Sequence, residues 1–582
     1  MKKNIISILF LVLLFSCQKK EETKAPIDSN KAFEKYKENF VTSLWELYPD
    51  WAASQGYHQL DSVLVVSDNV YKKRQLDFAH AQLDSLQNYP LENLSDNNII
   101  DFYMIQNQLK SSIFSIDKLK SYEWNPAEYN VCGAFAEILN GKYDALEVRL
   151  HSFNIKMDAI PVYYEAAKAN IKNPTLEHTA LAISQNLGGV SVFEKDLISA
   201  LGKSKLSNTE KKEIRDKAKT AVHAIVVYAN WLKDLNNKTP RSFRLGEKLY
   251  AEKFDLDIQS SYSADTIFAK AVNHKKELHE KMFVLADSLW PKYMKSIPKP
   301  DDKLQLIKMV IDKISLQHTT PSKFQSEIEK QIPELVAYVK AKDLLYIDPS
   351  KPLVVRKEPS YMAGVAGASI SAPGPYDKNA NTYYNVGSMS GWSAVKSESY
   401  LREYNDYILQ ILNIHEAIPG HYTQLVYSNQ SPSLIKAIFG NGAMVEGWAV
   451  YAERMMLESG YKNSPEMWLM YYKWNLRTTS NAILDYRVHT KNMSKEEAMN
   501  LLVTEAFQQQ AEAEGKWNRV SLSQVQLCSY FTGYTEIYDF REMLKKEEGA
   551  TFNLKQFHEK FLSYGSAPVK YIKELMMKER KK

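Results

Sequence analysis

A histidine–glutamate segment, IHEAIPGHYTQL at residues 414–425, has the residue types of a hydrolytic metal site. Two other His-Glu dipeptides occur in the chain, but only this copy is followed by Pro-Gly-His and, soon after, by a second acidic segment. In zinc hydrolases a HExxH motif presents two imidazoles to one zinc ion, and its glutamate deprotonates water as general base. The segment therefore predicts zinc-assisted hydrolysis, with His415 and His421 as metal ligands and Glu416 as the base.

The third metal ligand is expected on the segment VEGWAVYAERM, residues 445–455. Its Glu446 lies 25 residues after His421, a spacing that suits the third protein ligand of a zinc site in which water takes the fourth position. Glu453 follows on the same helical face, and we expect it to orient a ligand histidine through a hydrogen bond. Trp448 is expected to face away from Glu446 and to pack in the core.

The spacing of the two histidines differs from that of HExxH, because His421 stands six positions after His415 rather than four. On a regular helix this step rotates by about 600°, which leaves the two side chains about 120° apart. Pro419 also removes a helical hydrogen bond. A metal site therefore requires a break or bulge at residues 417–420. The alternative is that His415 ends one helix and His421 starts another, with no metal between them.

The motifs together resemble a bacterial family known as domain of unknown function 885. The family pattern HExxPGHxxQ is matched at residues 415–424, ending in Gln424, and EGWAxYxE is matched at residues 446–453. The pattern QxxSYxxG is matched at residues 526–533 and is followed by Arg541, whereas DYRVH stands at 485–489 in place of the family's Asp-Thr-Gly-x-His. Two upstream landmarks lie at residues 124–129 and 243–250. The resemblance implies a mostly helical, zinc-peptidase-like fold over most of the chain, and it implies no substrate.

Four further polar residues have a functional and a structural interpretation. His489 is a candidate for binding substrate or stabilising an oxyanion, or it is a hydrogen-bonded structural histidine. Tyr530 and Tyr534, four apart on an expected helix, are candidate donors to a tetrahedral oxyanion, although the chain has 36 tyrosines. Arg541 is a candidate for gripping a substrate carboxylate, and a structural salt bridge is the alternative.

The elements that must position these residues are mostly helices. Residues 31–346 are expected to form an N-terminal helical region, because apolar residues recur there at helical spacing, as at positions 304, 307, 311 and 314. Residues 347–582 are expected to form the catalytic region. It begins with a small sheet between about residues 350 and 390, and helices resume near Ser397. The predicted fold is mainly α, a large helical zincin-like body with a small β-sheet preceding the active-site helix.

The strand expected at residues 381–386, which contains Tyr384, directly precedes the histidine–glutamate helix. Zinc peptidases place an edge strand in this order, and such a strand can bind an extended peptide by adding it to the sheet. Tyr384 is therefore a candidate substrate contact. The alternative is an ordinary strand inside the sheet.

The N-terminus predicts export and lipid anchoring. Residues 1–16 have a basic start and a short apolar run, as signal peptides do, and they are too short for an ordinary membrane span. Cys17 directly follows Ser16, as in a bacterial lipobox, so we expect the cysteine to be lipidated and residues 17–30 to form a polar tether. The expected location is the cell envelope, on a bacterial membrane that we take to be the outer one, facing the periplasm or the surface. A plain secretory signal that contains a cysteine is the alternative.

Composition excludes some partners and leaves others open. The net charge of +5 is nearly balanced for 582 residues, so no nucleic-acid partner is expected. Cys132 and Cys528 are too far apart to form a disulfide framework or a clustered metal site, and they are expected to be buried thiols. The leading function is a zinc-dependent metallopeptidase acting on short peptides outside the cytoplasm. The alternatives are a non-catalytic lipoprotein that binds a peptide or small ligand, and a metal-dependent amidase. The sequence does not indicate an oligomeric state.

Overall fold

The structure is a computed structural model that describes residues 28–358, 368–377, 381–431 and 433–580. It is mainly helical, as the sequence predicts. The predicted signal peptide, the lipidation site Cys17 and most of the tether lie outside the described residues. The helices before the sheet are α1 (Ser29–Leu47), α2 (Pro49–Ser54), α3 (Asn69–Leu86), α4 (Asp96–Phe114), α5 (Cys132–Asn140), α6 (Leu146–Met157), α7 (Ile160–Asn170), α8 (Leu176–Gly189), α9 (Leu197–Lys203), α10 (Asn208–Asp234), α11 (Glu247–Ile258), α12 (Ala264–Tyr293), α13 (Lys303–Ile314) and α14 (Phe324–Ala341).

A three-stranded sheet separates these helices from the rest of the chain. Its strands are β1 (Leu353–Lys357), β2 (Ala368–Ser371) and β3 (Thr382–Val386), at the place where the sequence predicts a small sheet. The helices that follow are α15 (Ala394–Glu403), α16 (Asp406–Glu416), α17 (His421–Asn429), α18 (Leu434–Ile438), α19 (Gly442–Glu458), α20 (Pro465–Thr490), α21 (Lys495–Met499), α22 (Gln510–Leu522), α23 (Cys528–Glu548), α24 (Leu554–Ser563) and α25 (Val569–Glu579).

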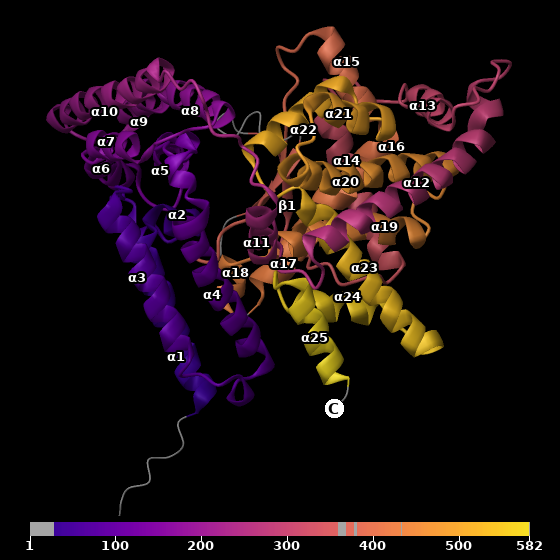
Figure 1. Ribbon diagram of the computed structural model, residues 1–582, viewed down its shortest axis with the longest axis horizontal. Helices are drawn as coiled ribbons and strands as arrows, with labels where there is room; N and C mark the ends of the chain where they lie inside the picture. Colours follow the sequence, from indigo (N-terminus) through magenta and orange to yellow (C-terminus); the bar gives the residue numbers. More distant parts are fainter. Residues whose placement is uncertain (1–27, 359–367, 378–380, 432, 581–582) are drawn as a thin grey trace, which may run out of the picture.

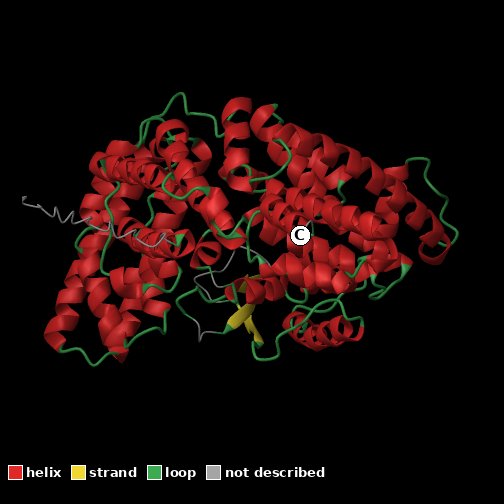
Figure 2. Ribbon diagram, turned by 90° about the horizontal axis from the view of Figure 1, so that it is seen from below, coloured by secondary structure: helices red, strands yellow, loops and turns green. Residues whose placement is uncertain are grey.

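The strand order is β1-β3-β2, with β3 parallel to β1 and antiparallel to β2. The prediction that residues 381–386 form an edge strand is therefore wrong, because β3 is the central strand. Burial agrees with this central position, since Tyr384 and Val386 are buried, whereas β2 is half-buried along its length. Figure 2 shows the sheet as a small group of strands in an otherwise helical molecule.

The helices form two groups around two hydrophobic cores. One core is made by residues from α5 to α10 and the segments beside them, and the other joins α1, α3 and α4 to the elements from α11 onward. Figure 1 shows α5–α10 at one end of the molecule and α12–α25 at the other. Because the larger core includes residues on both sides of position 346, the two predicted regions are packed together, and the boundary at 346–347 stays a prediction. In the part of the chain that is described, no helix is long and apolar enough to cross a membrane.

The helices that carry the predicted site begin at clear capping residues. Asn405 caps α16 by accepting from the backbone N–H groups of residues 407 and 408, and Asn441 caps α19 through residue 444. Ser464 caps α20, which has Pro465 at its first position. These caps fix where each helix starts and therefore which residues face the neighbouring helices.

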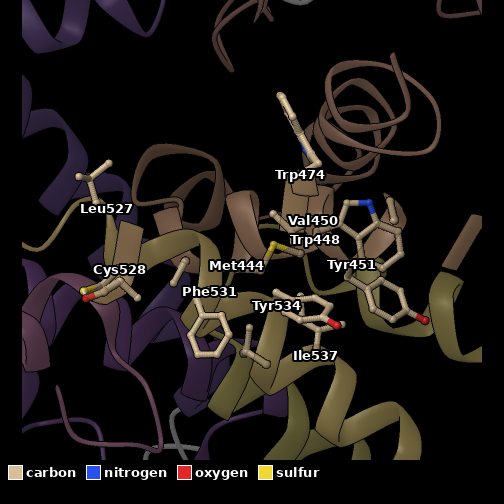
Figure 3. Close-up of a cluster of buried hydrophobic side chains, with 14 of the residues drawn as sticks. Met444, Trp448, Val450, Tyr451, Trp474, Leu527, Cys528, Phe531, Tyr534 and Ile537 are labelled. Carbon is tan, nitrogen blue, oxygen red and sulfur yellow. Dashed lines mark hydrogen bonds between the residues drawn. The ribbon is translucent and has the colours of Figure 1, made fainter. Parts of the chain in front are cut away.

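Helices α19 and α23 cross at a pair of glycines. A methyl group placed on Gly533 would lie 1.7 Å from the carbonyl oxygen of Ala443 and 2.9 Å from Cα of Gly447. Neither position has room for a side chain, so the two backbones are in direct contact. Figure 3 shows apolar and aromatic side chains of both helices, among them Met444, Trp448, Phe531 and Tyr534, in one buried cluster. The crossing brings Glu446 on α19 toward the N-terminal half of α23.

Candidate metal centre and its cavity

The six-residue spacing of the histidines is absorbed by a break between α16 and α17. Helix α16 ends at Glu416, a cis peptide joins Ile418 to Pro419, and α17 begins at His421. The N–H of Gly420 donates to the carbonyl oxygen of Ile414 at 2.9 Å, a step two residues longer than the regular helical bond. The break loops out two residues and lets His421 follow His415 on the same side of the chain.

Two residues hold this break in place. A methyl group on Gly420 would lie 1.9 Å from the carbonyl oxygen of His415, so only glycine fits against the end of α16. The indole N–H of Trp448 donates to the carbonyl oxygen of Pro419 at 2.8 Å. Trp448 is fully buried, as the sequence predicts for a core residue, and it also supports the loop between the two histidines.

The break brings His415, His421 and Glu446 together into a cluster that we call the metal group. Glu446 Oε2 lies 3.3 Å from Nε2 of His421 and 3.7 Å from Nε2 of His415, and the three ligand atoms all lie within 4.8 Å of one another. Ligand atoms of a tetrahedral zinc ion are about 3.4 Å apart, given zinc–ligand distances of about 2.1 Å. Two imidazoles and a carboxylate are also a typical ligand set of hydrolytic zinc. The residues present fit this ion.

Glu453 lies behind the metal group, where the sequence places it. Its Oε1 accepts from Nδ1 of His415 at 2.6 Å and from the indole N–H of Trp474 at 2.9 Å. Glu453 is fully buried. The carboxylate keeps Nδ1 of His415 protonated, so Nε2, which faces Glu446, is the ring nitrogen that would bind a metal ion after losing its own proton.

The metal group attracts positive charge. Burial alone would lower the pKa of His415, but the carboxylates of Glu446 and Glu453 raise it to about 10. Burial alone would raise the pKa of Glu446, but the two imidazoles facing it hold the pKa well below its usual range. The cluster thus stabilises protons between its imidazoles and carboxylates, and a divalent cation would replace them.

Glu416 and the metal group line one cavity of about 810 Å³. Burial raises the pKa of Glu416 above its ordinary value. Among the described residues, the Glu416 carboxylate has no hydrogen-bond partner. It is therefore free to exchange a proton with a molecule in the cavity. A volume of this size suits a small ligand or a short peptide.

The two candidate tyrosines lie in different surroundings. Tyr530 lines the cavity, and its hydroxyl accepts from Arg519 at 3.1 Å, which leaves the hydroxyl proton available to a ligand. Burial and the negative charge of Glu446 raise the pKa of Tyr530. Tyr534 does not line the cavity. It is buried and its ring contacts that of Tyr538, and Figure 3 shows it in the buried cluster beside α19.

Four other predicted residues also lie outside the cavity lining. His489 Nε2 donates to the carbonyl oxygens of residues 520 and 523, both at 3.0 Å. These contacts are those of a hydrogen-bonded structural histidine. Arg541 forms an ion pair with Glu458 at 2.8 Å, and Gln424 donates to Ser566. Tyr384 is fully buried, and its hydroxyl donates to Asn413 on α16 at 2.8 Å. It supports the helix that carries His415, and the structure brings it into no direct contact with the cavity.

The edge strand beside the cavity is β2 rather than β3. Residues 368–370 of β2 line the cavity. Among the described residues, β2 pairs only with β3 and lies at an edge of the sheet. The sequence predicts a small sheet in this region, but the edge position predicted for residues 381–386 belongs to β2.

Sequence reasoning missed the wall of the cavity formed by α20 and α22. Helix α20 contributes Trp474, Arg477, Thr478 and Asn481, and α22 contributes Glu512, Gly515, Lys516 and Arg519. A signal was present, because positions 474, 477, 478 and 481 have the spacing of one helical face and are polar or amphipathic in a mostly buried helix. Helices α20 and α22 are in contact, and Figure 1 shows them in the same part of the molecule.

The fold and the site define a mainly helical chain in which the metal group and Glu416 line one cavity. A family model described as "Bacterial protein of unknown function (DUF885)" matches residues 49–576. The chain belongs to this family. No curated protein matches the chain.

Solved structures share this fold. One is described as "a putative lipoprotein of unknown function from Shewanella oneidensis"; it is 52% identical, covers 94% of this chain and 99% of its own, and superposes with a TM-score of 0.87. A second, described as a "putative lipoprotein from Colwellia psychrerythraea", is 14% identical over 96% of this chain and 100% of its own, with a TM-score of 0.76. The second likeness shows the fold alone.

Proposed function

We propose that this chain is a zinc-dependent peptidase that hydrolyses short peptides outside the cytoplasm. The observation that carries the proposal is the arrangement of the metal group: three ligand atoms within 4.8 Å of one another, at a cavity that the unpaired Glu416 carboxylate also lines. Zn²⁺ held there would supply a Lewis acid for a peptide carbonyl and acidify a water molecule.

The side chains around the metal group have distinct roles in this proposal. The Glu416 carboxylate takes a proton from the attacking water and returns it to the nitrogen of the leaving amine. The Tyr530 hydroxyl donates a hydrogen bond to the carbonyl oxygen as negative charge develops there. Glu453 orients the imidazole of His415 and does not touch substrate.

The cavity and strand β2 favour short, extended substrates. A cavity of about 810 Å³ holds a few residues and no folded protein. As an edge strand among the described residues, β2 offers the backbone donors and acceptors of its side away from β3 to a peptide that lies along it. The substrate is therefore an unfolded peptide of a few residues.

The proposed location is the cell envelope, with a lipid on Cys17 as the anchor. The support is the lipobox-like Ser16-Cys17 in the sequence and the description of the 52% identical structure from Shewanella oneidensis as a putative lipoprotein. The outer membrane is the expected membrane. An extracytoplasmic peptidase would act on peptides in the periplasm or at the surface.

Hydrolysis of a mixed peptide library by wild type and Glu416→Gln tests the function. The variant keeps the size of the side chain and removes the base, so kcat should fall by roughly 10²- to 10⁴-fold while bound zinc and KM stay unchanged. Glu280→Gln is a matched control, because Glu280 also follows a histidine on a helix but is exposed and paired with Lys303 at 3.0 Å. This control should hydrolyse at the wild-type rate.

Other outcomes separate the rival functions. A zinc-loaded wild type that binds peptides without cleaving them would indicate a binding lipoprotein. A wild type that cleaves non-peptide amides and leaves the library intact would indicate an amidase. Near wild-type turnover by Glu416→Gln with zinc retained would remove Glu416 as the base.

A further inference from the structure

The wall of the cavity formed by α20 and α22 is rich in cations. Arg477 projects from α20, and Lys516 and Arg519 project from α22. We call these three residues the cationic wall. The one carboxylate on this wall among the described cavity-lining residues is Glu512, so positive charge is in excess.

The Glu512 carboxylate is paired mainly with Arg477. Arg477 Nη2 lies 2.5 Å from Glu512 Oε1, in the geometry of a close ion pair. Lys516 reaches the same oxygen only at 3.7 Å, which is beyond hydrogen-bond distance. Among the described residues, this long contact with Glu512 is the one ion pair of Lys516.

The position of the Lys516 side chain is unusual for a cation, because only 4% of the residue is exposed. A buried ammonium group whose one ion pair is long and shared with Arg477 is poorly compensated for its lost hydration. Burial, followed by the charge of Arg477, lowers the pKa of Lys516 to about 7. An anion in the cavity would remove both penalties. Arg519 is more exposed and has no ion pair among the described residues, since its guanidinium donates to Gln526 and Tyr530.

Two chains of contacts connect the cationic wall to the metal group. The guanidinium of Arg477 lies 4.7 Å from the ring centre of Trp474, whose indole N–H donates to Glu453, the partner of His415. On the other side, Arg519 donates to Tyr530, which lines the same cavity as Glu446. The cations therefore border the proposed reaction centre.

We propose that the cationic wall binds the C-terminal carboxylate of a peptide whose scissile amide lies at the metal group, so that the chain is a carboxypeptidase. This inference rests on the proposed function and specifies its substrate class. Lys516 supplies the central charge, and Arg477 and Arg519 flank it. Water adds across the C–N bond, which breaks: the water oxygen becomes part of the new carboxylate of the shortened peptide, and both water protons pass to the nitrogen of the released C-terminal fragment, which leaves as an ammonium group.

Peptides that differ only at the C-terminus test the proposal. The matched set contains a short peptide as its free acid, the same peptide as its C-terminal amide, and the amide with a glutamate near its end. Loss of a charge-assisted hydrogen bond to a buried cation costs roughly 10- to 100-fold. The free acid should therefore exceed the amide by this factor in kcat/KM. Recovery by the glutamate-containing amide would instead assign the site to acidic side chains and overturn the C-terminal assignment.

Variants of Lys516 connect this preference to the cationic wall. Lys516→Met keeps the length of the side chain and leaves the Arg477–Glu512 pair intact, so kcat/KM for the free acid should fall to the value for the amide. Lys516→Arg should restore most of the preference. Arg487→Met is the control, because Arg487 also lies on α20 but faces Glu497 outside this cavity. An acid preference that survives in Lys516→Met would overturn the assignment.

Binding measurements separate this inference from the proposed function. The affinity of Glu416→Gln for the acid and the amide is measured by calorimetry, which needs no turnover. If no peptide is cleaved by wild type but the acid binds 10- to 100-fold more tightly and loses this advantage in Lys516→Met, the carboxylate site stands and the peptidase proposal fails. If both forms are cleaved and bound equally, the peptidase stands and the carboxylate site is wrong.

Discussion

Replacement of Gly533 by alanine tests whether the α19–α23 crossing positions the site. The added methyl would lie 1.7 Å from the carbonyl oxygen of Ala443, although such carbons do not approach other heavy atoms within 3.0 Å. The two helices must therefore separate by more than about 1 Å, because the obstacle is backbone and no side chain can move aside. Overpacking of this kind costs about 3 kcal/mol, and the helix propensity of alanine offsets about 1 kcal/mol. The expected net loss in the free energy of unfolding is about 2 kcal/mol.

The assay is urea denaturation followed by circular dichroism, with Gly188→Ala as the matched control. Gly188 lies in α8, and a methyl there meets no atom within 4 Å, so this change should be neutral or stabilise by up to about 1 kcal/mol. Because α19 carries Glu446, the Gly533 variant should also bind zinc at least about ten-fold more weakly, since a metal site tolerates shifts of only about 0.5 Å. A Gly533→Ala protein with the stability and zinc affinity of wild type would refute the reasoning about this crossing.

Three further changes test other parts of the account. Glu453→Gln should weaken zinc binding by about 10- to 100-fold in a chelator competition, because it removes the carboxylate that orients His415; an unchanged affinity would show that Glu453 is not needed for the site. Burial lowers the pKa of His558 to about 4, so the unfolded chain binds an additional proton between pH 6.5 and pH 4 and stability falls as the pH falls, by up to about 3 kcal/mol from this group. His558→Gln should lose that part of the pH dependence, measured as the free energy of unfolding at several pH values, and an identical slope in the variant would contradict the assignment. Cys17→Ser should abolish palmitate labelling and release the protein from membranes in fractionation, whereas a wild type that is never labelled would exclude the lipid anchor.

The sequence predicted the parts of the structure that depend on local patterns. Mainly helical structure followed from 3.6-residue periodicity, and a small sheet near residues 350–390 followed from β-branched runs between turn residues. The grouping of His415, His421 and Glu446 followed from motif spacing once a break at 417–420 was allowed. The means of that break, a bond from Gly420 to Ile414 supported by Trp448, was beyond a pattern-based argument.

The parts that could not be predicted depend on contacts between distant segments. Strand order is set by pairing, and nothing local indicated that residues 382–386 would lie between two neighbours. Tyr530 and Tyr534 are four residues apart on one helix, and only the packing against α19 and α20 decides that the first reaches the cavity. Lys516 looks like an ordinary surface lysine in the sequence, and its burial becomes apparent only when α22 covers α20.

The metal content of the full-length, detergent-solubilised protein, purified without chelator, tests the central claim most directly. We predict about one zinc ion per wild-type chain by mass spectrometry. The zinc occupancy of Glu446→Ala should be far lower than that of wild type, and the matched control Glu280→Ala should keep the wild-type occupancy. A wild-type protein that contains no metal and still hydrolyses peptides, or a Glu446→Ala protein with full zinc occupancy, would contradict the assignment of His415, His421 and Glu446 as a catalytic metal site.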